Sequence, residues 1–474
     1  MIRLDLFALL FSMLLSSLGT SIINIAIPAL VQDFHTSLQN AQWLVLAYLL
    51  SNSTFIVIIG KISDRVNKKQ LYLTGLGIFS ISSFLSLSTS NLWVLVLLRA
   101  LQGVGSAILM SLSVVLLSEF AKKEELPKYM GLIGTMSAVG TASGPSVGGL
   151  LISLFGWKSI FMLMGVLGLS NFVLFLKFFK GKELRNHNSG EKLDILGSIL
   201  FGAAVLLFIL ILNKAKSFEV STLLILILSL VFIVVLFFQT EKRITNPLIK
   251  LSLLNHNNMK SHLLLNFIIS MVVMTTLVVG PFFLSQAQNL KYSDIGFVMA
   301  VSPLVSMLSG YLAGGIVQRI GAERTFVTGL IIVFFGTVSY TFLPIEFGTA
   351  GYILAAVILS PGYQLFQASN NTILMTESPF EQKGLVSSLN NLSRNLGLLS
   401  GASLMGAIFI WGVGTQDITT APSRDVLSGT QLAFAVTIVL SVVSLIISFM
   451  SSKPKKTFKT NGKDFYVTKK IKIL

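Results

Sequence analysis

Fourteen apolar stretches recur along this sequence, each close to the length that a membrane-spanning helix requires. A helix needs roughly 20 mostly apolar residues to cross the hydrocarbon core of a bilayer. The strands of a membrane β-barrel alternate between apolar and polar residues, so they do not give apolar runs of this length. The sequence therefore predicts an all-α polytopic membrane protein with fourteen spans. We place them at 6–30, 41–60, 71–88, 92–118, 130–155, 159–179, 195–212, 221–238, 262–284, 295–317, 325–343, 350–374, 385–411 and 431–450.

The composition favours one lipid-embedded unit over several soluble domains. Of 474 residues, 53% are hydrophobic and only 11% are charged, whereas soluble globular proteins carry about 25% charged residues. So few charges could not cover a water-facing surface of this size. The first apolar stretch is longer than the roughly 7–15 residue core of a signal peptide. We therefore interpret it as a retained first span.

The distribution of Lys and Arg predicts that both termini lie in the cytoplasm. With the N-terminus inside, the cytoplasmic segments hold 28 of the 35 basic residues and the external segments hold five. Cytoplasmic loops of membrane proteins carry such an excess. A missed span would move every later loop to the other side, so the distribution supports fourteen spans. We expect a multi-pass protein of the bacterial cytoplasmic (inner) membrane, and the net charge of +16 does not require a nucleic-acid partner.

Two loops of the sequence repeat each other at a constant offset. Residues 60–75 align with residues 314–329, and each loop joins the second and third spans of a six-span block. We therefore predict homologous six-helix bundles at 1–180 and 258–452, the usual build of an alternating-access carrier.

Two further segments complete the predicted organisation. The linker 181–257 would hold two extra spans. The lysine-rich tail 453–474 would be cytoplasmic and lie against anionic lipid head groups. A regulatory or protein-binding role for the tail is the alternative.

The loop 60–69 has the residue types of a hinge that closes the inner face. Gly60 allows close helix approach, and Asp64 would gain roughly 0.3–1 kcal/mol at the N-terminus of a helix in the opposite bundle. Arg65 would pair with Glu119. Such contacts exist only when the inner side is closed, so they would bias the conformational equilibrium. The predicted inner gate comprises Gly60, Asp64, Arg65, Lys68, Lys69, Glu119 and Arg319. A tight polar turn without a gating role is the alternative.

Two arginines lie inside predicted spans, where each costs at least roughly 2.5–3.5 kcal/mol. Arg99 shares a helix face with Gln102, and Arg394 lies about 16 Å beyond Lys383 at 1.5 Å per residue. We predict a polar cavity for substrate or protons, formed by Asn24, Arg99, Gln102, Gln364, Gln367, Asn371, Asn391 and Arg394. The alternatives are that Arg99 extends outward to the surface, and that the amides only join helices.

Span five combines glycines with a proline. Gly140, Gly144 and Gly148 recur at intervals of four residues, with Pro145 beside the second of them. The proline removes a backbone hydrogen bond and kinks the helix, and the glycines allow close packing. The segment is therefore expected to bend and to lie close to a neighbouring helix.

These motifs resemble those of the major facilitator superfamily and, within it, the fourteen-span drug:proton antiporters. The loop 60–69 resembles the superfamily signature Gly-x-x-x-Asp-Arg-x-x-[Arg/Lys]-[Arg/Lys], and the segment 99–105 resembles its Arg-x-x-x-Gly-x-[Gly/Ala] motif. Span five resembles the antiporter motif of drug exporters, carried here by Gly140, Gly144, Pro145, Gly148 and Gly149. The resemblance covers essentially the whole chain and implies the major facilitator fold and export.

One position departs from this family, which commonly has an aspartate where Gly19 stands. None of the nineteen acidic residues falls in the middle of a predicted span. Two explanations stay open. Carboxylates at span ends, such as Asp33 or Glu119, would carry the proton, or the substrate would be neutral or anionic and bind Arg99 and Arg394.

The sequence thus predicts a secondary active transporter that exports amphipathic drugs or toxic compounds in exchange for protons. The alternative is an exporter of an endogenous anionic amphiphile, such as a lipid, fatty acid or siderophore. An enzyme is not expected, because the histidines lie in loops or at span ends and cysteine is absent. ATP drive is unsupported without a phosphate-binding Gly-x-x-x-x-Gly-Lys-[Ser/Thr] loop. We expect a monomer without cofactor or metal.

Overall fold

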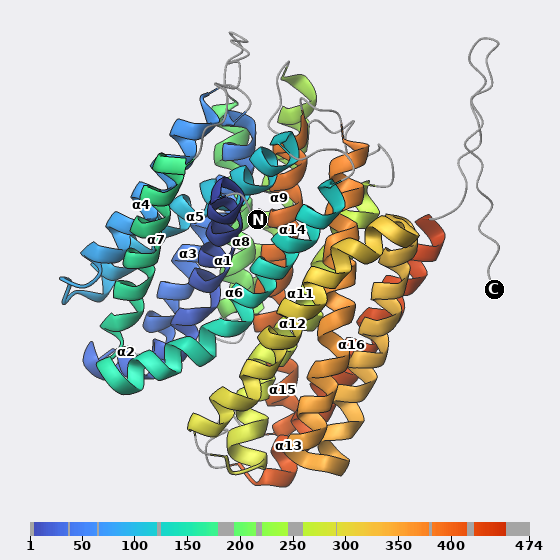
Figure 1. Ribbon diagram of the computed structural model, residues 1–474. Coiled ribbons are helices and arrows are strands. Elements are labelled where there is room, and N and C mark those ends of the chain that lie inside the picture. Colours follow the sequence, from blue (N-terminus) through green and yellow to red (C-terminus); the bar gives the residue numbers. More distant parts are fainter. Residues whose placement is uncertain are drawn as a thin grey trace.

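The fold is helical throughout the part of the chain that can be described. The computed structural model (Figure 1) describes residues 4–36, 38–63, 66–120, 125–178, 194–214, 220–244, 259–290, 292–378, 382–414 and 421–451. No strand occurs in these residues. The predicted all-α class is therefore confirmed. The predicted basic tail lies outside the described residues. So do most residues of the loops around the two inserted helices, at 179–193, 215–219 and 245–258.

The described helices fall into three sets along the chain. The first set is α1 (Leu4–Ser21), η1 (Ile22–Ala26), α2 (Ile27–Asp33), α3 (Leu38–Ile62), α4 (Lys68–Leu85), α5 (Leu92–Phe120), α6 (Leu126–Phe155) and α7 (Lys158–Phe178). Next come α8 (Ile195–Lys214) and α9 (Val220–Arg243). The last set is α11 (Met259–Phe282), η2 (Phe283–Ala287), α12 (Tyr292–Ile320), α13 (Ala322–Glu377), α14 (Lys383–Ser400), η4 (Gly401–Met405), α15 (Gly406–Val413) and α16 (Ser423–Ser451).

Eleven helices in the described ranges are long and apolar enough to cross a membrane. The predicted count of fourteen is not confirmed by this number. Neither α4 nor α8 is among the eleven, and α13 counts once although it has 56 residues. Inside α13, Gly348 adopts φ 55° and ψ −130°. This non-helical conformation divides α13 into two helices, and its positive φ is one that glycine adopts far more readily than other residues.

The helices form two groups, with one pair between them. Figure 1 shows α1 to α7 (blue to teal) on one side and α11 to α16 (yellow to red) on the other; we call these the first and second helix groups. They meet where α6 packs against α12 and where α3 packs against α14. Helices α8 and α9 pack against each other, and α8 contacts both α3 and η4. The inserted pair therefore touches both groups.

The two groups share one packing arrangement. In the first group, a Cβ atom added at Gly140 of α6 would overlap the carbonyl oxygen of Leu14 on α1. In the second group, a Cβ atom added at Gly397 of α14 would overlap the carbonyl oxygen of Phe267 on α11. In both pairs the absence of a side chain lets two helix backbones approach closely.

Candidate functional site

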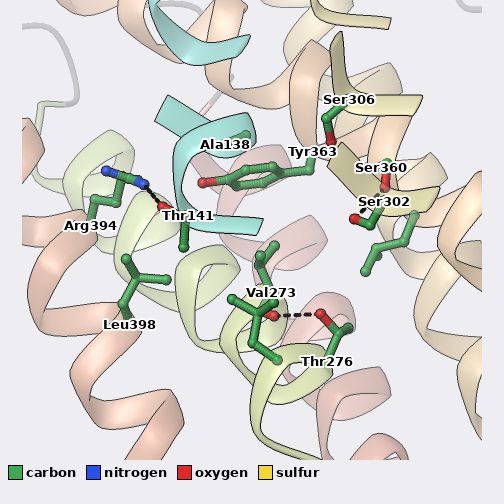
Figure 2. Close-up of a pocket in the computed structure, with 12 residues that line it drawn as sticks. Ala138, Thr141, Val273, Thr276, Ser302, Ser306, Ser360, Tyr363, Arg394 and Leu398 are labelled. Carbon is green, nitrogen blue, oxygen red and sulfur yellow. Dashed lines mark hydrogen bonds between the residues drawn. The ribbon is translucent and has the colours of Figure 1, made fainter. Parts of the chain in front are cut away.

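A small cavity lies between the two helix groups (Figure 2). Its volume is about 30 Å³, and its walls come from α6, α11, α12, α13 and α14. A second cavity of about 10 Å³ shares Tyr363 and Arg394 with the first. A single water needs roughly 10–15 Å³ of such space, so these cavities hold a few waters at most. Neither of these two cavities has room for a drug-sized molecule.

Arg394 is the charged residue that both cavities share. Its side chain is 5% exposed. Its Nη2 donates to Thr141 Oγ1 on α6 at 2.9 Å, a contact that joins the two helix groups. The Thr141 hydroxyl in turn donates to the carbonyl of Ser137 at 3.1 Å. The Nε of Arg394 has no hydrogen-bond partner among the described residues. None of the described residues that line either cavity carries a carboxylate.

A chain of amides extends from the cavity into the second helix group. Gln367 donates to the Tyr363 hydroxyl at 3.0 Å and to Asn266 Oδ1 at 3.1 Å. Asn266 donates to Asn390 Oδ1 at 2.8 Å, and Asn390 donates to Asn371 Oδ1 at 2.7 Å. These bonds connect α11, α13 and α14. The structure therefore brings together Gln367 and Asn371, as predicted, but through two residues that the prediction did not include.

Two other predicted amides differ in their environments. Asn391 lines the smaller cavity and donates to the carbonyl of Met110 on α5 at 3.5 Å. Gln364 lines neither cavity. It is 1% exposed, and neither of its amide atoms has a partner in the described part of the chain. Such a buried unpaired amide is costly, so we expect Gln364 to find partners in another conformation. Its assignment to the cavity stays a prediction.

Arg99 lies elsewhere, entirely within the first helix group. It is fully buried, so the alternative that it extends to the surface is wrong. Its Nε donates to the carbonyl of Leu44 at 3.1 Å, its Nη2 to the carbonyl of Gly19 at 2.9 Å, and its Nη1 to Gln102 Oε1. The guanidinium also stacks 4.2 Å from the centre of the Tyr48 ring. Neither Arg99 nor Gln102 is among the residues that line the two cavities described above, and no described hydrogen bond joins either of them to Arg394.

The same region accounts for the glycine at position 19. A Cβ atom added there would lie 2.8 Å from the Tyr48 hydroxyl oxygen. That hydroxyl is held in place because it donates to the carbonyl of Ser16 at 2.7 Å and also contacts the Ser106 hydroxyl at 2.7 Å. Tyr48 thus fills the space that an aspartate side chain would need.

Replacing Arg99 with leucine is expected to lower the thermal stability of the protein. The change removes all three described hydrogen bonds of the guanidinium, and a hydrogen bond that involves a charged group contributes about 1.5–3 kcal/mol. Thermal unfolding of the purified protein in detergent measures the effect. The matched control is Arg394→Leu, which removes only one described hydrogen bond and should lower the melting temperature far less. Equal losses would contradict this difference between the two arginines.

The predicted inner gate is only partly visible. Asp64 and Arg65 lie outside the described residues. Glu119 accepts a hydrogen bond from Lys68 Nζ at 2.6 Å. The pair joins the start of α4 to the end of α5 within the first group. The structure thus shows Lys68 as a partner of Glu119. Because Arg65 lies outside the described residues, its predicted pair with Glu119 stays a prediction.

The other predicted gate residues lie near this pair or at the equivalent turn. Gly60 is buried, and its carbonyl accepts from the Ser63 hydroxyl at 2.8 Å. The backbone N–H of Lys69 donates to the Asn67 side chain at 3.0 Å, which caps α4. Arg319 is exposed at the end of α12. We call the end of the molecule where α4 begins and α5 ends the Lys68 end.

The antiporter motif lies on α6, and its three spaced glycines face α1 and η1. Added Cβ atoms at Gly144 and Gly148 would overlap Ser21 and Ile25, whereas Gly149 has only Ile25 at 3.9 Å. Pro145 lies inside the helix and is half-buried. Thr141, next to Gly140, instead bonds Arg394. Helix α6 therefore connects α1 to the cavity.

Asn24 was predicted to line the cavity, but the structure places it elsewhere. It lies on η1, is exposed, and donates to the carbonyl of Ser21 at 3.1 Å. It lines neither cavity. The 3-10 turn between α1 and α2 directs the side chain differently from the straight helix assumed in the prediction.

Acidic residues avoid the middle of the helices, as predicted. Within the described ranges, each lies near a helix end or, for Glu346, beside the break at Gly348. Asp33 ends α2 and accepts from Trp157 Nε1 at 2.9 Å. Asp194 and Glu241 are buried where α8 begins and α9 ends. The prediction had placed both outside the spans and did not foresee their burial.

Four residues of the site were missed from the sequence. Tyr363 precedes Gln367 by four residues and so shares its helix face, and Thr141 directly follows a motif glycine. Asn266 is a single polar residue in an apolar stretch, a pattern that marks interhelical contacts as often as cavities. Asn390 directly precedes the predicted Asn391 in the polar run 387–395. The spacing of Tyr363 and this polar run were therefore the usable signals.

Comparison with known proteins agrees with this fold. The family profile of the Major Facilitator Superfamily matches residues 9–402. The riboflavin transporter RibZ of Clostridioides difficile (strain 630) is 29% identical, covering 83% of this chain and 85% of that protein. The multidrug transporter protein MdtP of Bacillus subtilis (strain 168) is 23% identical, covering 84% and 74% respectively. The tetracenomycin C resistance and export protein of Streptomyces glaucescens is 24% identical, covering 86% and 76%.

A solved structure has the same architecture. The crystal structure of the human organic anion transporter MFSD10 (TETRAN) matches with a TM-score of 0.66, over 94% of this chain and 99% of that chain. The sequence identity is 14%, so this likeness concerns the fold alone. The membrane-spanning helices and the match of the family profile identify an integral membrane transporter. The chain belongs to the Major Facilitator Superfamily.

Proposed function

We propose that this protein is a secondary active exporter of amphipathic compounds that works by alternating access and is driven by exchange with protons. The observation that carries the proposal is the polar cavity between the two helix groups, which joins buried Arg394 to Thr141 of the opposite group. Residues from both groups would release a substrate there when the groups separate on one side. Relatives named for multidrug transport and for resistance and export are consistent with this direction.

The proposal also includes the number of spans, the two homologous bundles, the orientation in the membrane and the oligomeric state. Counting α13 as two helices and adding α4 and α8 to the apolar helices gives the fourteen spans of the drug:proton antiporter family. The matching glycine contacts of α6 on α1 and of α14 on α11 support homologous bundles at 1–180 and 258–452. The Lys68 end would face the cytoplasm of a bacterium, together with both termini. A monomer with its tail on anionic lipids completes the proposal.

Proton coupling would depend on carboxylates at helix ends. Carboxylates at helix ends are the available carriers, and Glu119 is a candidate because its Oε2 is buried without a described partner while Oε1 binds Lys68. Protonation of Glu119 would weaken the ion pair and thereby change the relative stability of two conformations. Asp33, bonded to Trp157, is the second candidate.

The experiment is dye efflux from everted membrane vesicles. Vesicles that contain the protein should accumulate amphipathic dyes when a proton gradient is present and should lose them after a protonophore is added. Vesicles with the cysteine-locked variant described in the Discussion provide the background. Accumulation that persists after the gradient collapses would refute proton coupling, and accumulation no greater than that background would refute export of these compounds.

A further inference from the structure

We propose that the substrate is an amphiphile with a single acidic group, such as a carboxylate, and that Arg394 binds this group. The inference rests on the proposed function and specifies its substrate class. It assigns the role to one of the two buried arginines only.

The first argument is the unmet bonding capacity of Arg394. A guanidinium has five N–H donors and stays charged at any physiological pH. Arg394 is 5% exposed, donates one described hydrogen bond and leaves its Nε unpaired. A buried charge without a counter-charge is costly, and a carboxylate can accept from Nε and a neighbouring nitrogen at once. A bound anion would therefore accept hydrogen bonds from the Arg394 donors that the described residues leave unpaired.

The second argument is the contrast with Arg99, which shows how this fold satisfies a buried arginine with protein groups alone. Arg99 donates three hydrogen bonds within the first helix group and stacks on the Tyr48 ring. Arg394 lies at the junction of both groups and lines both cavities. The arginine with free donors is thus the one with space beside it.

The third argument is the chemistry of the cavity wall. Tyr363 accepts a hydrogen bond from Gln367, so its own hydroxyl proton is available to a ligand. Figure 2 shows this hydroxyl pointing toward the side of the cavity that Arg394 and Thr141 occupy. The rest of the wall is mixed: apolar side chains such as Val273 and Leu398 lie beside the hydroxyls of Ser302, Ser306 and Ser360, which line the side away from Arg394 (Figure 2). An acidic head group would pair with Arg394, and the apolar side chains would contact the body of an amphiphile, whereas a cationic head group would face Arg394 without a carboxylate to offset it.

Substrate class can be tested with probes that share one body. Pyrene compounds ending in a carboxylate, an alcohol or a trimethylammonium group differ only in the head group. We expect the purified protein to bind the carboxylate at least about tenfold more tightly than the other two in detergent, measured by pyrene fluorescence, and everted vesicles to accumulate it preferentially. Arg394→Gln should remove this preference, and Arg394→Lys should keep part of it because the charge remains.

The matched control is Arg324→Gln, which removes an exposed arginine at the start of α13, away from both cavities. It should keep the preference for the carboxylate. If Arg394→Gln does not fold, Tyr363→Phe and Arg394→Lys decide the question, and each should weaken carboxylate binding selectively. Equal binding of the three probes, or a preference that survives in Arg394→Gln, would overturn the inference.

The two proposals fail in different ways. Binding in detergent needs no gradient, so it tests the anion site even if export is absent. Carboxylate binding without vesicle accumulation would leave the anion site intact and refute export of this probe. Accumulation of all three probes at equal rates would support export and refute the anion site.

Discussion

Cysteines placed at Ser111 and Ser388 are expected to form a disulfide that stops transport until the bond is reduced. The two hydroxyl oxygens lie 2.8 Å apart, on α5 of the first helix group and α14 of the second. Side chains this close allow the roughly 3.5–4.5 Å separation of Cβ atoms that a disulfide needs. Ser388 precedes Arg394 toward the Lys68 end, so the bond would hold the groups together on that side of the cavity. A carrier that cannot separate its bundles there cannot alternate.

The chain has no cysteine of its own, so a disulfide within it can form only between the two introduced cysteines. Transport in vesicles should fall more than about tenfold after oxidation and return with a reductant, since a covalent bond removes one conformational state altogether. The matched control is Thr337→Cys with Ser441→Cys, whose oxygens lie 3.2 Å apart within the second group. That pair should cross-link without loss of transport. Full activity of the oxidised Ser111/Ser388 pair would show that these helices do not separate.

The second large effect is expected from Gly140→Val on α6. An added Cβ atom would overlap the carbonyl oxygen of Leu14 and lie 2.9 Å from the Ser17 Cβ atom. A backbone carbonyl of a helix cannot move aside as a side chain does, and overpacking of this kind costs about 1–3 kcal/mol or more. We expect a lower melting temperature and a loss of transport, because α6 also carries Thr141 to the cavity.

Gly149→Val is the control from the same motif. A Cβ atom at Gly149 would meet only Ile25, at 3.9 Å, which is an ordinary contact. This variant should keep its stability and most of its transport. Similar losses for both variants would mean that the motif acts through something other than its packing on α1. Thermal unfolding and vesicle transport, measured on matched amounts of protein, distinguish the outcomes.

Much of the fold could be predicted because apolar runs determine membrane helices directly. The predicted span 92–118 corresponds to α5 at Leu92–Phe120, and 159–179 corresponds to α7 at Lys158–Phe178. The burial of both arginines also followed from their position within such runs. These features depend on local sequence, so local reasoning was enough.

The structure differs from the prediction where a side chain's partners come from segments that are distant in the sequence. Whether a buried arginine is satisfied depends on carbonyls supplied by other helices, which no spacing within α5 or α14 reveals. Arg99 and Arg394 therefore looked equivalent in sequence, although only Arg394 lines the cavities. The pairing of Glu119 with Lys68 depends in the same way on how the start of α4 lies against α5.

The contact between Gly19 and Tyr48 has a consequence for how this protein could change over generations. A carboxylate at position 19 would meet the phenol oxygen of Tyr48, whereas loss of that ring alone would uncover the guanidinium of Arg99. Either substitution by itself is expected to be harmful, and the two together are expected to be tolerated, because an aspartate would then lie beside the arginine. Descendants of this sequence should therefore gain an acid at position 19 only in combination with a smaller residue at position 48.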